Sequence, residues 1–172
     1  MWPGTFLNIN NGKRDRYAVF AEWERQTSAQ WLTLLGLRYE RVSTDADPVQ
    51  GYAPTNGPAP RRNWQLRDST AFNAADRSKQ DNNIDLSALA HYMHDDNLDI
   101  EFGLARKVRS PNLYERYTWS TWAMAAGMNN FVGDGNGYLG DVNLKPEKAH
   151  TVSVGLDWHT AEKHWQLKAT PF

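Results

Sequence analysis

Residues 84–106 read IDLSALAHYMHDDNLDIEFGLAR, two runs of alternating apolar and polar side chains separated by the polar tetrapeptide 94–97. Successive side chains of a β-strand point to opposite faces of the sheet, so this alternation is typical of strands with two different faces. A connection of four polar residues has the length of a hairpin loop. The segment therefore predicts two adjacent antiparallel strands, at 84–93 and 98–106.

The same alternation recurs in four further stretches. It predicts strands near 17–24, 31–42, 150–158 and 165–172. No stretch shows an apolar helical period over more than about two turns, so we expect an all-β chain. Because strands joined by short connections usually lie side by side, we expect an antiparallel up-and-down meander of about six strands.

The connections between these strands alternate in length. Three are short, whereas residues 43–83 and 107–149 form two connections of about 40 residues each. Loops of that length are uncommon in a compact domain, but an outer-membrane β-barrel combines tight turns on one side with long extracellular loops on the other. The alternation favours a barrel segment over a soluble antiparallel sheet with one solvated face, which has the same side-chain pattern.

The composition excludes several classes of protein. The chain has 172 residues, a formal net charge of −1, no cysteine and a mean hydropathy of −0.72. Near-neutral charge argues against a nucleic-acid partner, and the lack of cysteine excludes a thiolate metal site or nucleophile. No run approaches the length of a transmembrane helix, although barrel strands remain compatible with this hydropathy. Because the common catalytic motifs are absent, we do not expect an enzyme.

Aromatic residues concentrate near the ends of the predicted strands. Tryptophan and tyrosine are enriched where a membrane meets water, because their rings are amphipathic. A lipid-facing row would end on such residues, with charged side chains on the opposite face toward a wet or plugged lumen. The strand-end aromatics are Trp23, Trp31, Tyr39, Tyr92, Trp158 and Trp165.

Three segments carry a resemblance to a known family. They read GLRYE (36–40), GLARKVRSPNLYERY (103–117) and GDVNLKPEKAH (140–150). In this order they resemble the C-terminal part of the barrel of TonB-dependent outer-membrane receptors, and the resemblance covers nearly the whole chain. It implies part of a barrel of about 22 strands in the Gram-negative outer membrane, with 43–83 and 107–149 as extracellular loops. The family's signal peptide and plug domain have no counterpart here, so we expect a partial barrel, residues 1–172.

A finer resemblance is to the copper-receptor branch of that family, carried by residues 117–138 and by MWPGTF at 1–6. It implies uptake of a scarce ligand, here copper, with energy from the TonB system. Copper would be the transported ligand rather than a cofactor, and we expect none of the latter. The implied partners are outer-membrane lipid, the TonB complex through a region missing at the N-terminus, and the metal or its chelate. A ferric-siderophore receptor and a soluble carbohydrate-binding β-domain remain open as alternatives.

The loop 107–149 contains the first candidate ligand residues. Met124 and Met128 form an M-x3-M pair, and thioether sulfur suits Cu(I). The alternative is hydrophobic packing of the two methionines under Trp119 and Trp122, since methionine fills gaps well. Trp119, Trp122 and Tyr138 are candidate ligand-contacting aromatics, which in a siderophore receptor would stack on an organic chelate.

Other candidate groups lie on the strands and turns. His91 and Met93 project from one face of the predicted strand 84–93 and could hold a soft metal; the competing interpretation is a histidine bonded to a neighbouring carboxylate. We expect His159 and His164 to be solvated beside a turn. The glycine-rich run 133–137 lacks the ligand pattern of a calcium loop, so it predicts a flexible tip or tight turn.

The second family segment concentrates charge. Its charged side chains could steer anions at the barrel mouth. The interpretation we favour is a network of ion pairs and hydrogen bonds that fastens the loop to the barrel wall. These candidate loop-fastening residues are Arg106, Arg109, Glu115 and Arg116. At the far end of the loop, Pro146 lacks a backbone donor and marks the start of the next strand.

Overall fold

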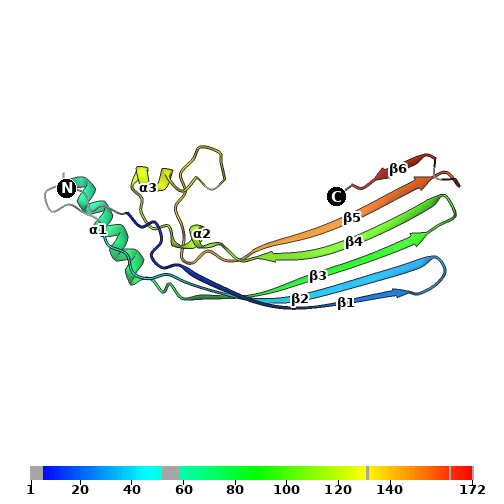
Figure 1. Ribbon diagram of the computed structural model, residues 1–172, viewed down its shortest axis with the longest axis horizontal. Helices are drawn as coiled ribbons and strands as arrows, with labels where there is room; N and C mark the ends of the chain where they lie inside the picture. Colours follow the sequence, from blue (N-terminus) through cyan, green and yellow to red (C-terminus); the bar gives the residue numbers. More distant parts are fainter. Residues whose placement is uncertain (1–5, 52–58, 131, 163, 172) are drawn as a thin grey trace. The chain divides into compact units, whose positions relative to one another are not determined.

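A computed structural model describes residues 6–51, 59–130, 132–162 and 164–171 of the chain. In it six strands form one sheet in the order β1-β2-β3-β4-β5-β6 (Figure 1). The strands are β1 (Lys13–Gln26), β2 (Trp31–Asp45), β3 (Lys79–Met93), β4 (Leu98–Arg109), β5 (Glu147–His159) and β6 (Gln166–Ala169). The predicted antiparallel up-and-down meander is confirmed, with antiparallel registers across β3, β4, β5 and β6.

The strands reach further toward the long connections than the alternation predicts. β1 begins at Lys13 rather than Tyr17, β3 begins at Lys79 rather than Ile84, and β2 continues to Asp45. The added residues are polar on both faces of the sheet, so they carry no alternation of hydropathy. Because the backbone ladder does not depend on side-chain polarity, the pairing continues where the sequence signal stops.

The last strand is shorter than expected. β6 covers Gln166–Ala169 instead of 165–172, and Phe172 lies outside the described residues. β5 begins directly after Pro146, as predicted for a residue that cannot donate to the ladder.

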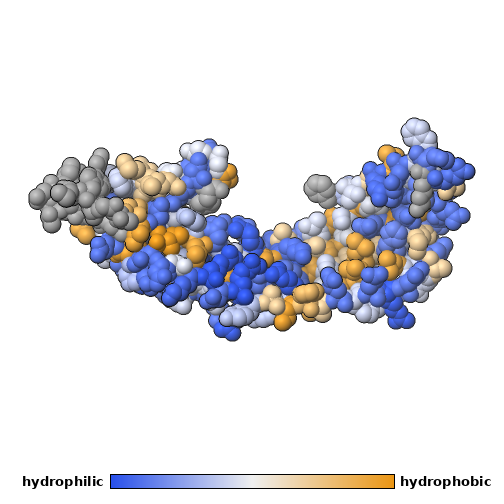
Figure 2. Space-filling view, viewed as in Figure 1, coloured by the Kyte–Doolittle hydropathy of each residue, from blue (hydrophilic) through white to orange (hydrophobic). Residues whose placement is uncertain are grey.

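The registers separate two chemically different faces of the sheet. Ala88, Leu104 and Val152 stand opposite one another across β3, β4 and β5, and alternate residues in both directions along these strands share their face. Leu104 is 57% exposed and Val152 is 66% exposed, so this apolar face is uncovered. Hydrophobic residues are accordingly visible at the surface along the strands in Figure 2. We name this side of the sheet the apolar face and the other side the polar face.

Aromatic side chains lie at both ends of the apolar face. At the short turns, the rings of Trp31 and Tyr92 have centroids 4.6 Å apart. At the opposite strand ends, the Tyr39 hydroxyl donates to Asn82 Oδ1 over 2.7 Å. This arrangement matches the two interfacial belts of a transmembrane strand region.

The chain divides into two compact units. The sheet unit contains residues 17–41, 82–109 and 147–172, and the loop unit contains residues 1–16, 42–81 and 110–146. The loop unit holds helices α1 (Ala59–Ala74), α2 (Leu113–Tyr117) and α3 (Ala123–Gly127). None of these helices is both long and apolar enough to cross a bilayer in the described part of the chain.

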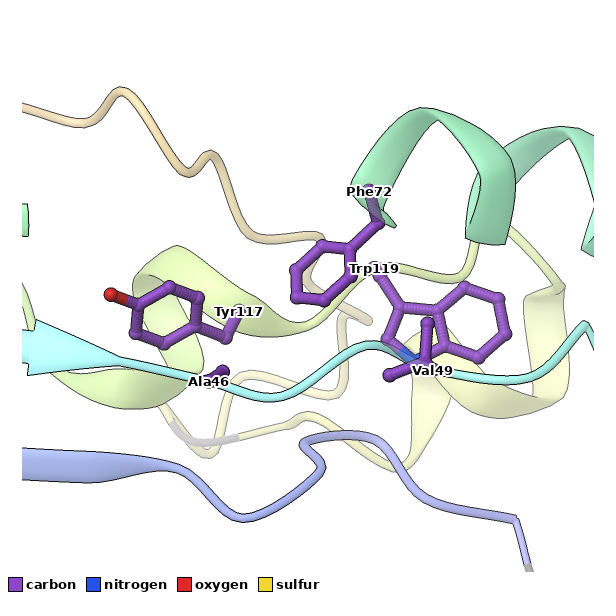
Figure 3. Close-up of a cluster of buried hydrophobic side chains, with 5 residues drawn as sticks. All are labelled: Ala46, Val49, Phe72, Tyr117 and Trp119. Carbon is purple, nitrogen blue, oxygen red and sulfur yellow. The ribbon is translucent and has the colours of Figure 1, made fainter. Parts of the chain in front are cut away.

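The loop unit has a hydrophobic core of its own. Its buried members are Ala46, Val49, Phe72, Tyr117 and Trp119 (Figure 3). The ring of Phe72, from α1, packs against the ring of Tyr117 in a T-shaped arrangement, with ring centroids 6.5 Å apart. The segments expected to be two long loops are thus folded against each other around a common core.

Helix α1 contradicts the expectation that no helix exceeds two turns, because it is 16 residues long. Its buried side chains include Gln65, Asp68, Ser69 and Phe72, which have the i, i+3, i+4, i+7 spacing of one helical face. Three of these four are polar, so a search for apolar periodicity cannot detect the helix. The polar side chains on its buried face form hydrogen bonds instead.

The C-terminal end of α1 is closed by side chains. Arg77 Nη1 donates to the carbonyl oxygens of Phe72, Asn73 and Ala75 at the end of the helix, where carbonyls run out of intrahelical donors. Asn73 both accepts from the Val49 N–H and donates to the Val49 carbonyl, each over 2.8 Å. An asparagine side chain therefore replaces a backbone partner for the segment that follows β2.

The Tyr117 hydroxyl points away from Phe72 and Trp119 (Figure 3) and is fully buried. It donates to the Arg77 carbonyl over 2.7 Å and shares a hydrogen bond with Thr44 Oγ1 over 2.8 Å. Burial raises the pKa of Tyr117, so the hydroxyl stays protonated at neutral pH.

We expect Tyr117→Phe to lower the free energy of unfolding by about 1–3 kcal/mol, because two buried acceptors lose a partner. Denaturant unfolding followed by tryptophan fluorescence measures the change. Tyr114→Phe is the matched control, since Tyr114 is 51% exposed, and its change should stay within about 0.5 kcal/mol. Equal losses in both variants would contradict this account of Tyr117.

Candidate functional site

The GLRYE segment places its two charged residues on the polar face of the sheet unit. Arg38 Nη2 lies 2.8 Å from Glu40 Oε1, and Arg38 Nη1 lies 3.3 Å from Asp85 Oδ2. Asn83 Nδ2 donates to Glu40 Oε2, and Asp85 Oδ1 accepts from the Val108 N–H over 2.8 Å. Glu40 and Asp85 are both buried. The motif therefore joins β2, β3 and β4 through charge-assisted hydrogen bonds.

Arg116 is the most connected charged residue of the loop unit. Its guanidinium donates to Thr44 Oγ1 (3.0 Å), to Asp81 Oδ1 (3.0 Å) and to the Leu144 carbonyl (2.9 Å), and it forms an ion pair with Asp81 in which Nη2 lies 2.9 Å from Oδ2. The side chain is 2% exposed, and that of Asp81 is 9% exposed. One cation thus links the strand ends at 44 and 81 with α2 and with the segment before β5.

The other three predicted loop-fastening residues also have partners. Arg109 forms a two-point ion pair with Glu147 across β4 and β5, at 2.9 and 3.0 Å. Glu115 accepts from the Asn112 N–H, while its own N–H donates to Asn112 Oδ1, which makes a capping box at the start of α2. Arg106 donates to the Ile84 carbonyl oxygen.

Met124 lies in α3 and Met128 directly follows it as the C-cap residue, and both are exposed. Met124 is 62% exposed and Met128 is 69% exposed, whereas Ala125 between them is buried. The Met128 N–H donates to the Met124 carbonyl over 3.2 Å, so the two residues stand one helical turn apart. Both side chains leave most of their surface accessible rather than filling a gap in the core.

Helix α3 rests on a close backbone contact. The Tyr138 N–H donates to the Ala126 carbonyl over 3.2 Å, and a Cβ placed on Gly137 would lie only 2.6 Å from the Ala126 carbonyl carbon. Only glycine fits at position 137 without moving the helix. The two methionines therefore project from a segment with fixed backbone support.

The three candidate aromatics occupy different environments. Trp119 is buried, its Nε1 donates to the Leu7 carbonyl over 3.0 Å, and its ring stacks on Phe6 at 5.5 Å. Trp122 meets Phe6 edge-on at 6.1 Å. Tyr138 lies beside the tip of the loop, where its hydroxyl donates to Asp134. Of the three, Trp119 contributes most to the loop-unit core.

Residues 133–137, which the sequence predicts to be a flexible tip or a tight turn, lie in a bend of the chain. Gly133 and Gly135 have φ values of 76° and 82°, which favour glycine. Hydrogen bonds from the Tyr138 hydroxyl and from the Asn136 side chain and backbone lower the pKa of Asp134 to about 2. The carboxylate is therefore charged and committed to this bend. The same hydrogen bond raises the pKa of Tyr138.

A cleft of about 300 Å³ opens in the loop unit between α1 and the segments 118–121 and 139–143. Phe72, Trp119, Leu139 and Val142 contribute its apolar wall, and Asp68 contributes a carboxylate. This volume is at the lower limit of small-molecule pockets. Sequence reasoning missed the cleft, because α1 carries no apolar period that would place Asp68 or Phe72.

Asp68 is held charged inside this unit. Burial alone would raise its pKa, but hydrogen bonds from the Thr121 hydroxyl and N–H and from Arg67 lower the pKa below its usual value. The carboxylate thereby links α1 to the chain that leads into α3.

His91 and Met93 lie on the polar face near the short turns. His91 Nε2 is 3.7 Å from Asp99 Oδ1, which favours the carboxylate-bonded interpretation of this histidine. His159 was expected to be solvated, but its side chain is only 13% exposed: it lies 4.0 Å from Asp99, and its Nδ1 is 3.2 Å from the Thr160 carbonyl. His164, at 72% exposed, is solvated as expected.

No group of three or more histidine or carboxylate side chains is placed to hold a metal ion among the described residues. The candidate soft-metal ligands named from the sequence are therefore two pairs, Met124 with Met128 and His91 with Met93.

Comparison with known proteins identifies one family. The family model described as TonB-dependent receptor-like, beta-barrel, matches residues 2–172. No curated protein and no solved structure gave a significant match.

We expect Asp81→Ala to lower the free energy of unfolding by about 3–5 kcal/mol, because it leaves the Arg116 guanidinium buried without its counter-ion. Glu147→Ala is the matched control, since the Arg109–Glu147 pair is exposed and such pairs contribute at most about 1 kcal/mol. Denaturant unfolding of both variants measures the difference. Similar small losses would show that the buried pair does not stabilise the loop unit.

A second prediction concerns acid stability. Because the folded pKa of Asp68 lies below its ordinary value of 3.8, its contribution is complete above that value and is lost as the pH falls through the folded pKa. We expect Asp68→Asn to reduce stability near neutral pH and to flatten the stability profile below about pH 4. Unfolding measured as a function of pH tests this, and an unchanged acid slope would argue against an ionised Asp68.

Proposed function

Since this chain belongs to the family of TonB-dependent receptor β-barrels, we propose that the receptor it forms part of takes up copper. The family lies in the outer membrane of Gram-negative bacteria and consists of transporters rather than enzymes. Its members act with TonB to move ligands across that membrane. The proposal names the transported ligand and the residues of this chain that bind it.

The exposed pair Met124 and Met128 carries the proposal. Both side chains are more than 60% exposed, so neither thioether is enclosed in the core of the loop unit and both are accessible to a ligand. Two thioethers on one face of a helix can approach one metal ion, because residues four apart are neighbours on the helix surface. Thioether sulfur is a soft ligand that selects Cu(I) over the hard cations.

The loop unit gives this pair the rigidity that a capture site requires. α3 is fixed at the Gly137 contact and by the Tyr138 N–H, and Asp68 joins α1 to Thr121 just before it. A pair held in place loses less conformational entropy on binding than one on a mobile loop. We propose that residues 107–149 form an extracellular loop whose methionines make the first contact with copper.

Uptake of a ferric siderophore is the second candidate. The cleft beside Trp119, with its aromatic wall, favours an organic ligand. Because most of the Trp119 ring is committed to the core, we rank this below copper. A soluble carbohydrate-binding domain is no longer proposed, since the family is an outer-membrane one.

The decisive experiment replaces both methionines by leucine, which removes the sulfur and keeps an apolar side chain of similar size. In the complete receptor, we expect the double variant Met124→Leu/Met128→Leu to lose Cu(I) affinity by at least about ten-fold. Mutation of a residue that only hydrogen-bonds a metal ligand already causes a loss of that size. Competition with a chromophoric Cu(I) chelator measures binding, and copper accumulation by metal-limited cells measures uptake.

Met93→Leu is the matched control, because it removes the same sulfur from the sheet unit. We expect it to leave Cu(I) affinity unchanged. Loss of binding in Met93→Leu alone would assign capture to the His91–Met93 pair instead. If the double variant binds Cu(I) as the unaltered receptor does, and the same cells take up a ferric chelate, the transported ligand would be a ferric siderophore rather than copper.

A further inference from the structure

The charged residues of the apolar face are confined to one end of it. Along β3, β4 and β5 the residues on this face are apolar or uncharged polar except for Arg106, Lys148 and His150. Arg106 stands directly opposite His150, and Lys148 is the next residue of β5 on the same side. All three are basic groups, whereas the carboxylates of these strands project from the polar face.

Among the residues that the structure describes, no carboxylate is paired with these basic groups. Neither Arg106, Lys148 nor His150 takes part in an ion pair with the described residues, although Arg109 and Glu147, next to them on the polar face, pair with each other. The hydrogen bond from Arg106 Nη1 to the Ile84 carbonyl leaves further guanidinium donors available. An unpaired cationic site beside a membrane calls for an anionic partner.

A groove of about 680 Å³ runs over the apolar face from this basic site. Its apolar lining comes from five neighbouring strands, β1 to β5, and Arg106 and His150 lie at one end. Ala88 stands opposite Leu104, so a methyl group lies between larger side chains and leaves the surface hollow there. The side chains that line the groove include Trp23, Leu35, Leu37, Leu86, Leu104 and Val152.

We propose that this groove binds an anionic membrane lipid whose head group carries phosphate. An acyl chain lies over Leu35, Ala88 and Leu104, and the phosphate is bound by Arg106 and Lys148. The polarity of the site selects this occupant, because an apolar channel with a cationic end is complementary to an amphiphile with an anionic head. A free anion would leave the channel unfilled, and an uncharged lipid would leave the cations unpaired.

The location of the site along the strands agrees with a head group. Arg106 and Lys148 stand level with Leu86 and Val108, in the rows of the apolar face nearest to the strand ends where Tyr39 bonds Asn82. A membrane protein meets the polar lipid region at the level of such interfacial aromatic residues. The guanidinium of Arg106 can contact two phosphate oxygens at once, which an ammonium cannot. Lys148 adds a second charge from the neighbouring strand.

The test uses the complete receptor reconstituted in phosphatidylcholine vesicles that contain a minor fraction of spin-labelled phosphatidylglycerol or spin-labelled phosphatidylcholine. We expect the receptor to select phosphatidylglycerol. Arg106→Gln and Lys148→Gln should each reduce that selectivity about five-fold, since a basic residue at a membrane surface contributes about that factor. Arg109→Gln, on the opposite face of the same strand, should leave it unchanged.

Further variants separate the two parts of the site. Ala88→Phe keeps every charge but fills the groove, so we expect it to weaken phosphatidylglycerol binding while barrel folding, checked by gel mobility without heating, is retained. Arg106→Lys retains the positive charge at this position. Lys148→Gln still tests the need for charge if the Arg106→Gln variant fails to insert into the membrane.

Equal association of the two lipids with the unaltered receptor would overturn the proposal, and so would selectivity that survives the loss of both charges. Displacement of phosphatidylglycerol by millimolar inorganic phosphate would show instead that the basic residues form a site for a simple anion. Loss of selectivity that leaves Cu(I) binding intact would show that the lipid site and the capture site are separate.

Discussion

The alternation of side chains along a paired strand is the constraint on which the rest of this structure depends. Once β3, β4 and β5 are in register, each residue is assigned to one of two faces, and a shift by a single residue would exchange them. Leu104 and Val152 then face outward with most of their surface exposed, while Asp85 and Glu40 are buried among polar partners. Such a sheet is stable only where the apolar face meets something other than water. Membership of an outer-membrane family supplies that environment.

The loop unit follows a different principle. Its core is small, and polar groups carry much of its organisation: Arg116 links four segments, Asp68 joins α1 to Thr121, and Asn73 pairs with the backbone of Val49. Buried polar groups are costly when a partner is missing, so such networks select one arrangement over others. Within this arrangement α3 and the residue that follows it carry two exposed methionines, Met124 and Met128.

Charge is distributed according to the faces and the units. Carboxylates and their partners occupy the polar face, and the basic residues of the apolar face collect at one end, where Arg106 and Lys148 form no ion pair with the described residues. The metal proposal and the lipid proposal therefore concern separate surfaces of the chain. One depends on soft sulfur ligands on a helix, and the other on cations beside an apolar groove.

The six strands, their antiparallel order and their two faces followed from the sequence alone, because hydropathy alternating with a period of two is a local signal that every strand carries. The start of β5 directly after Pro146 also followed from local chemistry, because proline has no backbone N–H to donate. Tertiary structure alone decided the rest. α1 escaped detection because its buried face is largely polar, the strand extensions because both of their faces are polar, and His159 because its burial depends on Asp99 from another strand. The groove, the cleft and the Arg116 network likewise join residues far apart in the chain, and no periodicity along a sequence can report on such contacts.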